Sequence, residues 1–268
     1  MRDRPFLSIV IPVYEGERVI RRTIDSVQDH AAKLGWPIEI VVGFSRGRDR
    51  TADVLSGVCR DWANVAVVDT TEHFGKGGAV RLAMGRTSGR FRCFVDADAG
   101  VSFDQVERAL ELVDDYDIVV GSRYMVGGSA GRRSPGRIVL SRGGNLLMRL
   151  FLGLRFADTR APLKVYRGEV ADRLFPALRL DGFGFDTELL FVAGRLGYRI
   201  AEFPVRWTPG ETSSVRIPRD AVRSIVELLR IRWYWLSGVY DGLHPSEPAN
   251  RVGGQSRSRD GEAPAIRG

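Results

Sequence analysis

The sequence predicts an α/β fold in which helices cover both faces of a mostly parallel sheet, as in a Rossmann-like three-layer α/β/α sandwich. Three observations lead to this prediction. Short apolar runs alternate along the chain with longer segments of helical spacing. The runs are nearly continuous in apolar residues, which is typical of strands buried on both faces. One run ends abruptly in acidic residues, at the place where open α/β sheets bind ligands.

The first half of the chain alternates strands and helices regularly. Strands are expected at Phe6–Val13, Ile38–Val42, Val65–Val68, Phe91–Asp96 and Asp117–Gly121, and helices at Glu17–Leu34, Asp49–Trp62, Lys76–Arg86 and Gln105–Val113. In the first helix, Ile20, Ile24 and Val27 fall on one face, and Gly35 ends the pattern. Because helices join consecutive strands, the crossovers should be right-handed and the sheet parallel.

The composition changes after Gly121. Residues 122–142 are rich in Gly, Ser and Arg, which predicts a mobile loop over a site. The elements expected beyond it are a helix at Ile138–Leu154, a strand at Pro162–Tyr166, a helix at Asp186–Leu196, a strand at Tyr198–Trp207, a polar loop at Thr208–Ser214 and a helix at Arg219–Trp235. We expect one domain over residues 1–240, in halves of about 6–121 and 122–240. Residues 245–268 have the composition of a disordered tail.

Charge and cysteine content exclude several classes of function. The chain has 268 residues and a formal charge of +7, and its only lysines are Lys33, Lys76 and Lys164. The excess is therefore arginine, which favours bidentate contacts to phosphate and carboxylate. The arginines form no basic arm, and no aromatic RNA-binding motif occurs, which argues against nucleic-acid binding. Cys59 and Cys93 fit neither a disulfide framework nor a zinc pattern, as is typical of a reducing cytosol. Neither a signal peptide nor a membrane-spanning run is expected.

Two aspartates end the buried run Arg92-Cys93-Phe94-Val95-Asp96-Ala97-Asp98. In an extended chain, positions two apart share a side, so Asp96 and Asp98 are expected to reach the same ion. Two hard oxygen ligands suit Mg²⁺ or Mn²⁺ that arrives with substrate phosphates. The alternative for an isolated pair is structural, with Asp96 capping a turn and Asp98 exposed in a loop.

Glycines and a lysine open the third expected helix. Gly75-Lys76-Gly77-Gly78-Ala79 matches neither the P-loop nor the dinucleotide fingerprint. In one interpretation, the glycines let the backbone approach a phosphate and Lys76 adds a positive charge. In the other, the segment is a plain glycine-rich turn. Tyr14, at the end of the first strand, lies where a base or ribose would pack, or else in an ordinary strand-to-helix turn.

Arginines gather after the fifth expected strand. Gly121-Ser122-Arg123-Tyr124 follows it directly, and Arg137 precedes Ser141 by one helical turn. A guanidinium with a hydroxyl can hold a phosphate, and a solvated basic loop is the alternative.

The last helix mixes arginines with the aromatic run Trp233–Trp235, which suits a membrane surface or a helix packed in the core.

These motifs, in this order, resemble a known family. A strand ending P-x-Y, a helix start G-K-G-x-A-V-R, a strand ending D-A-D and a strand ending G-S-R-Y look like the family 2 glycosyltransferases with the GT-A fold. The sequence is most similar to the polyprenyl-phosphate glycosyltransferases, the dolichyl-phosphate mannose and glucose synthases. Asp158-Thr159 with Lys164, the segment Phe185–Leu190 and the segment Glu202–Trp207 also look like that subfamily.

The resemblance implies a substrate for each half of the chain. The first half would bind a nucleotide sugar, UDP- or GDP-linked, and the second half a polyprenyl phosphate. The metal and the diphosphate would be held by Asp96 and Asp98. The nucleotide would be lined by Pro12, Tyr14, Glu15 and Glu17, with Gly75 and Lys76 beside it. The acceptor phosphate would be held by Arg123, Arg137 and Ser141. Asp186 would sit near the reacting centre, and Asp98, Asp186 and Arg123 are the expected catalytic residues.

The sequence departs from the family pattern at two places. The family has a paired-aspartate motif, D-D-G-S-x-D-x-T, after the second strand. Here Asp49 and Thr51 fit that motif, but Phe44-Ser45 replaces the aspartate pair that helps bind the nucleotide. The usual lysine of a late glycine-serine-lysine loop appears as Ser214, with Arg216 as a substitute.

The resemblance implies an inverting transfer of a hexose to the lipid phosphate, aided by Mg²⁺ or Mn²⁺. A lipid acceptor implies a cytoplasmic protein in peripheral contact with the inner face of the cell membrane. Two other functions stay open. One is a transferase that glycosylates a small molecule or natural product, and the other is a nucleotide-sugar-binding relative without turnover.

Overall fold

The computed structural model describes residues 4–72, 75–98, 100–129, 143–144, 146, 148–208 and 217–243. The strands are β1 (Leu7–Tyr14), β2 (Ile38–Ser45), β3 (Val65–Asp69), β4 (Phe91–Phe94), β5 (Ile118–Ser122), β6 (Leu163–Arg167) and β7 (Ile200–Pro204). The helices are α1 (Ile20–Leu34), α2 (Thr51–Asp61), α3 (Lys76–Met84), α4 (Phe103–Leu112), α6 (Gly168–Leu174), the short helix η1 (Phe175–Ala177), α7 (Phe185–Arg195) and α8 (Ile217–Leu236).

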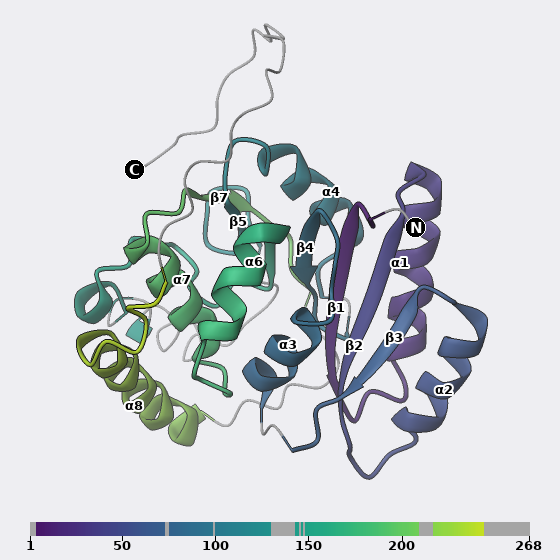
Figure 1. Cartoon of the computed structure of the whole chain (residues 1–268), viewed down its shortest axis with the longest axis horizontal. Helices are drawn as coiled ribbons and strands as arrows, with labels where there is room; N and C mark the ends of the chain where they lie inside the picture. Colours follow the sequence, from purple (N-terminus) through teal and green to yellow (C-terminus); the bar gives the residue numbers. More distant parts are fainter. Residues whose placement is uncertain are drawn as a thin grey trace, which may run out of the picture.

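The described residues form a seven-stranded sheet in the order β3-β2-β1-β4-β6-β5-β7, which runs from right to left in Figure 1. Strands β1 to β4 are mutually parallel, and β5 is parallel to β7. Strand β6 lies antiparallel between β4 and β5. The sheet is thus mostly parallel, as expected, with one reversed strand that the spacing of elements does not reveal.

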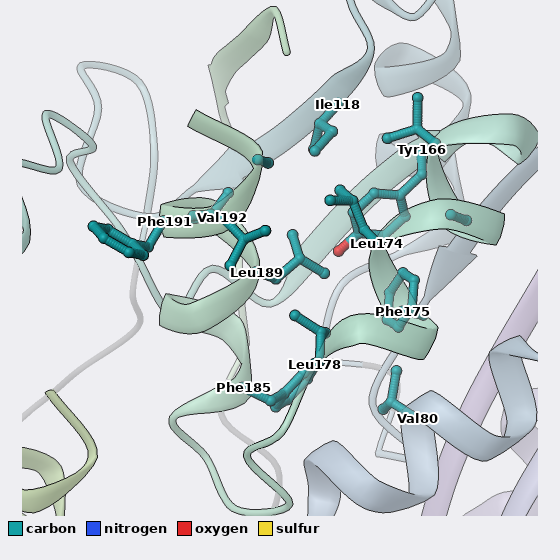
Figure 2. Close-up of a cluster of buried hydrophobic side chains, with 14 of the residues drawn as sticks. Val80, Ile118, Tyr166, Leu174, Phe175, Leu178, Phe185, Leu189, Phe191 and Val192 are labelled. Carbon is teal, nitrogen blue, oxygen red and sulfur yellow. The ribbon is translucent and has the colours of Figure 1, made fainter. Parts of the chain in front are cut away.

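Two apolar layers lie on the two faces of the sheet, because alternate strand residues point to opposite sides. In β1, Ile9 and Ile11 face α1, α2 and α4, whereas Val10 faces the layer under α3, α6, α7 and α8. Figure 2 shows Val80 of α3 and Leu189 of α7 within this second layer. Each fully buried Leu, Ile or Phe contributes about 1.5–3 kcal/mol of transfer free energy. The three-layer α/β/α prediction is therefore confirmed.

Several element boundaries differ from the sequence prediction. The first helix begins at Ile20 and not at Glu17, and the strand expected at Tyr198–Trp207 is limited to β7. Helix α6 was not predicted, although Val170, Ala171 and Leu174 give it a helical apolar spacing. Its position directly after β6, with no turn residues between them, obscured that signal.

Some predictions fall outside the described residues. These are residues 130–142 of the loop expected at 122–142, residues 209–214 of the loop expected at 208–214, and the tail at 245–268. Of the helix expected at Ile138–Leu154, residues 143–144, 146 and 148–152 are described and are helical, whereas 153 and 154 are described and lie beyond the end of the helix. In the described part of the chain, no helix is both long enough and apolar enough to span a membrane.

Candidate functional site

The candidate site lies at the edge of the sheet where β1, β2 and β4 end. Strand β1 pairs in parallel with both neighbours, which places Tyr14 opposite Ser45 and Val10 opposite Phe94. Asp96 follows the end of β4 by two residues. The carboxyl ends of these strands therefore bring Tyr14, Ser45 and Asp96 to one rim, where α/β sheets bind ligands.

Strand β4 ends before Asp96, and Ala97 and Asp98 form a turn, so the expected strand over Phe91–Asp96 and the extended chain through Asp98 are wrong. The chain bends after β4 ends, and a carboxylate oxygen of Asp98 accepts the N–H of Gly100 at 3.2 Å. The hydroxyl of Thr23 on α1 donates to the carbonyl oxygen of Ala97 at 2.6 Å and anchors the turn. Burial raises the pKa of Asp98, and the charge of Asp96 raises it further. The two carboxylates are therefore close enough to act on one another.

Lys76, the first residue of α3, lies against these aspartates. Its Nζ is 2.6 Å from Oδ1 of Asp96. Burial lowers the pKa of Lys76, but the charges of Asp96 and Asp186 outweigh it, so the net pKa is raised and the ammonium stays protonated. Gly75 has a φ of 123°, and the carbonyl of Asp181 leaves no room for a side chain there. The local sequence G-K-G thus lets α3 begin directly beside the carboxylates.

Asp186, at the start of α7, is paired with a buried lysine of β6. Nζ of Lys164 is 2.6 Å from Oδ1 of Asp186 and donates to the carbonyl oxygen of Ala161 at 2.9 Å. The side chains of Lys164 and Asp186 are 0% and 6% exposed. Burial lowers the pKa of Lys164, and the carboxylate of Asp186 opposes that shift. A covered, ion-paired carboxylate is suited to orienting its neighbours, and its catalytic role stays a prediction.

Arg123, which follows β5, is held by a buried carboxylate. Its Nε and Nη2 lie 2.7 and 3.0 Å from the two oxygens of Asp158, and Nη2 also donates to the carbonyl oxygen of Arg160 at 2.8 Å. The guanidinium stacks over the ring of Trp207 at 5.5 Å. Burial lowers the pKa of Arg123, but Asp158 outweighs it, and Asp96 adds to the upward shift. Arg123 therefore belongs to the same charged cluster, and its contact with an acceptor phosphate stays a prediction.

The carboxylates of Glu15 and Glu17 brace the loop between β2 and α2. Oε1 of Glu15 accepts the N–H of Arg48 at 3.2 Å, and Oε2 of Glu17 accepts the N–H of Arg50 at 2.9 Å. Glu15 has a φ of 50°, a left-handed conformation that turns the chain after β1. Both acids lie at the predicted nucleotide side of the rim, but these bonds give each a structural partner within the loop.

The end of β2 carries the residues that replace the aspartate pair. Phe44 is buried, and the hydroxyl of Ser45 lies 2.9 Å from that of Thr70. Asp69, at the end of β3, lies opposite Phe44 in the strand pairing. Asp69 is an acid at this rim that the sequence reasoning missed, and its position at the end of a parallel strand was the available signal. Tyr14 is 63% exposed beside Ser45, whereas Pro12 lies within β1.

Two predicted acceptor residues, Arg137 and Ser141, lie outside the described residues. Within the described part of the chain, no cluster of three or more acidic, histidine or cysteine side chains could hold a metal ion. A cation at Asp96 and Asp98 would therefore take its remaining ligands from a bound molecule or from water.

The chain is similar to known glycosyltransferases in sequence and in fold. The family Glycosyl transferase family 2 matches residues 8–175. The dolichyl-phosphate beta-glucosyltransferase of Saccharomyces cerevisiae is 28% identical over 256 residues, covering 88% of this chain and 76% of the relative. The enzyme of the same name from Drosophila melanogaster is 31% identical over 225 residues, covering 78% and 69%.

Solved structures resemble the fold. Glucosyl-3-phosphoglycerate synthase from Mycobacterium tuberculosis, in complex with Mn²⁺, UDP and glucosyl-3-phosphoglycerate, matches with a TM-score of 0.61 and 20% identity, covering 85% of this chain and 80% of that one. Mannosyl-3-phosphoglycerate synthase from Rubrobacter xylanophilus matches with a TM-score of 0.62 and 19% identity, covering 92% and 78%. At these identities the likeness concerns the fold.

Proposed function

Because the chain belongs to glycosyl transferase family 2, we propose that it transfers a hexose from a UDP- or GDP-linked sugar to a polyprenyl phosphate such as dolichyl phosphate. The names of the relatives from yeast and fly support a lipid phosphate acceptor, and they make glucose the first sugar to test. The observation that carries the proposal is the charged rim, where Lys76 lies 2.6 Å from Asp96 and the charge of Asp96 acts on Asp98. Paired acids and one ammonium suit a metal-bound diphosphate.

We propose that Asp96 and Asp98 hold Mg²⁺ or Mn²⁺. Both side chains are hard oxygen ligands, and the raised pKa of Asp98 means that a positive charge beside it would be stabilising. A cation held there would supply Lewis-acid neutralisation of the departing nucleoside diphosphate. The ammonium of Lys76 would add to that neutralisation from the start of α3.

In the proposed reaction, an acceptor phosphate oxygen forms a bond to the anomeric carbon of the sugar. The bond from that carbon to the diphosphate oxygen breaks, with inversion at the carbon. A phosphate monoester has a second pKa of about 6, so the acceptor is largely ionised at neutral pH and needs positioning more than a strong base. The buried pair of Lys164 and Asp186 suits this requirement, because a covered ion pair can hold the residues around it in a fixed arrangement.

The proposal is tested by measuring product formation by mass spectrometry. UDP-glucose and GDP-mannose are supplied with Mg²⁺, Mn²⁺ or a chelator, and the acceptors are a short-chain prenyl phosphate and 3-phosphoglycerate. We expect glucosylation of the prenyl phosphate that requires the cation. Product formed only on 3-phosphoglycerate would instead support a small-molecule acceptor, and absence of any product would support a binding protein without turnover.

The role of Asp98 is tested by Asp98→Asn, which keeps the shape of the side chain and removes its charge. We expect transfer to fall by at least about a hundredfold, on the order of one catalytic electrostatic contact. Asp104→Asn, an exposed carboxylate in the first turn of α4, is the matched control and should keep full activity. Normal turnover by Asp98→Asn in folded protein would remove Asp98 from the metal site.

Because the proposed acceptor is a membrane lipid, the proposal includes peripheral contact with a membrane surface. The enzyme must reach a phosphate that lies at the level of the lipid headgroups. Aromatic and arginine side chains are enriched where proteins contact that level.

A further inference from the structure

Helix α8 carries a second apolar face on its outer side. Its inner face packs Leu228 and Ile231 into the core under α6 and α7. Five large apolar side chains of the helix are exposed by 44–72%: Ile225, Val226, Leu229, Trp233 and Leu236. At about 3.6 residues per turn, these positions fall within one sector of roughly 100°. They form a continuous stripe, which we call the α8 outer stripe.

Arginines border the α8 outer stripe on both sides. Arg230 and Arg232 are exposed, and the helical spacing places one along each edge of the stripe. The acid in the described side chains of α8 is Glu227, which is 7% exposed and lies 3.2 Å from Nε of Arg223. The outward surface of this part of the helix is therefore apolar and cationic, with its carboxylate turned inward.

We propose that the α8 outer stripe docks on an anionic membrane surface. The inference rests on the proposed function, because a polyprenyl phosphate acceptor lies in a membrane. The apolar residues enter the boundary between headgroups and acyl chains, and Trp233 suits that boundary because its ring is apolar with one polar edge. Arg230 and Arg232 contact lipid phosphates at the edges of the stripe. The chain as a whole carries a formal charge of +7, which also favours approach to an anionic surface.

A second copy of the chain fits the stripe less well. A symmetric dimer presents the same patch from both subunits, so each arginine at the edge approaches its equivalent or the other arginine. The described outer face of α8 offers no carboxylate to neutralise them. An anionic lipid surface supplies both the apolar environment and the negative charge.

The inner side of α8 connects the stripe to the candidate site. A side chain on Gly182 or Gly184 would meet the carboxylate of Glu227 at 2.7 Å, so the loop before α7 lies directly on the helix. The same loop contacts the start of α3, where the carbonyl oxygen of Asp181 accepts the N–H of Gly78 at 3.2 Å. The loop before α7 therefore joins the helix that carries the stripe to the start of α3, where Lys76 lies.

The proposal is tested by co-flotation of the full chain with lipid vesicles. We expect the protein to float with mixed phosphatidylglycerol–phosphatidylcholine vesicles, to float much less with pure phosphatidylcholine, and to be released by salt. The double variant Leu229→Gln/Trp233→Gln should bind the mixed vesicles at least about tenfold more weakly, because both apolar anchors are lost. Arg230→Gln/Arg232→Gln should lose about tenfold and most of the salt dependence.

The control for these variants is Val126→Gln, which replaces a fully exposed apolar side chain outside α8 and should bind as the natural sequence does. The docking proposal is overturned if the natural protein does not float with anionic vesicles, or if Leu229→Gln/Trp233→Gln floats equally well. It is also overturned if light scattering finds a dimer that this double variant converts to monomer.

A separate assay distinguishes the docking proposal from the proposed function. Transfer to a water-soluble short-chain prenyl phosphate is measured without vesicles. Flotation without any transfer would contradict the proposed function and leave the docking surface standing.

Discussion

The guanidinium of Arg123 donates hydrogen bonds to both carboxylate oxygens of Asp158 and to the carbonyl oxygen of Arg160. The sequence had instead suggested that this side chain binds a phosphate. The pattern G-S-R-Y at the end of a strand cannot show this, because Asp158 comes from a segment 35 residues away. The carboxylate of Asp158 is 3% exposed, so it needs the guanidinium for its own stability. A phosphate contact by Arg123 would therefore use the side of the guanidinium that faces away from Asp158.

Arg123→Ala is expected to lower the free energy of unfolding by about 3–5 kcal/mol, because it leaves the carboxylate of Asp158 buried without its partner. Urea denaturation measures this loss. Arg199→Ala is the matched control, since Arg199 and Asp117 form a more exposed pair at 3.7 Å, and it should cost less than about 1 kcal/mol. Equal losses in the two variants would contradict the structural role of Arg123.

The acceptor role of Arg123 is tested separately with Arg123→Lys, which keeps the charge and loses the bidentate geometry. We expect the KM for the acceptor phosphate to rise more than the KM for the donor. An unchanged KM for the acceptor, in a variant that folds normally, would exclude Arg123 from the acceptor site.

At the level of elements, the start of α3 depends on glycine for two reasons. The φ of 123° at Gly75 is costly for any residue with a Cβ atom, and the carbonyl of Asp181 occupies the space that a Cβ would take. The next residue, Lys76, carries the ammonium that faces Asp96. A change at Gly75 thus acts on the fold and on the site together.

Gly75→Ala is expected to cost about 1–3 kcal/mol of unfolding free energy through backbone strain and to weaken binding of UDP with Mn²⁺. Denaturation and calorimetric titration measure the two effects. Gly85→Ala at the other end of α3 is the control, because Gly85 has a φ of −66° and its nearest neighbours are at ordinary contact distance. Normal UDP binding by a folded Gly75→Ala protein would remove this turn from the donor site.

Helix α7 is tied to its surroundings through Glu188. This carboxylate accepts the hydroxyl of Tyr240 at 2.5 Å and the N–H groups of Arg179 and Leu180 at 2.8 and 2.9 Å. Burial raises the pKa of Glu188, and these hydrogen bonds only partly oppose the shift. The folded protein therefore binds this proton more tightly than the unfolded chain does.

The stability contributed by Glu188 is expected to be greatest below the ordinary glutamate pKa of about 4.3 and to decrease as pH rises through the raised folded pKa. The difference in unfolding free energy between the natural protein and Glu188→Gln should then shrink as pH increases toward neutral. Urea denaturation across that range measures it. Glu169→Gln, an exposed glutamate in the first turn of α6, should show a difference that does not change with pH. A constant difference for Glu188→Gln would contradict the raised pKa.

For the whole molecule, local patterns predicted the alternation of strands and helices and brought the candidate site residues to one rim of the sheet. They did not predict the antiparallel insertion of β6, because strand order depends on packing between distant segments. The same limit applies within the site. Asp96 and Lys76 belong to short motifs that the sequence shows, whereas the pairs of Arg123 with Asp158 and of Lys164 with Asp186 join segments far apart in the chain. Asp186 is also buried, and its burial depends on segments that are distant in the sequence, so the local pattern did not reveal it.

The folded chain as a whole should be stabilised by donor and cation together, since only the folded state brings β1, β4 and α3 to one rim. A ligand at a hundredfold excess over its Kd stabilises by about 2.7 kcal/mol, and each kcal/mol raises the Tm of a chain of this size by roughly 2–4 °C, so we expect a rise of about 5–10 °C. Thermal unfolding with UDP-glucose and Mn²⁺ measures it. A chelator or Asp98→Asn should abolish the rise, while Asp104→Asn should keep it. A rise that persists with the chelator would show that the donor binds without the cation, and one that persists in Asp98→Asn would place the cation elsewhere.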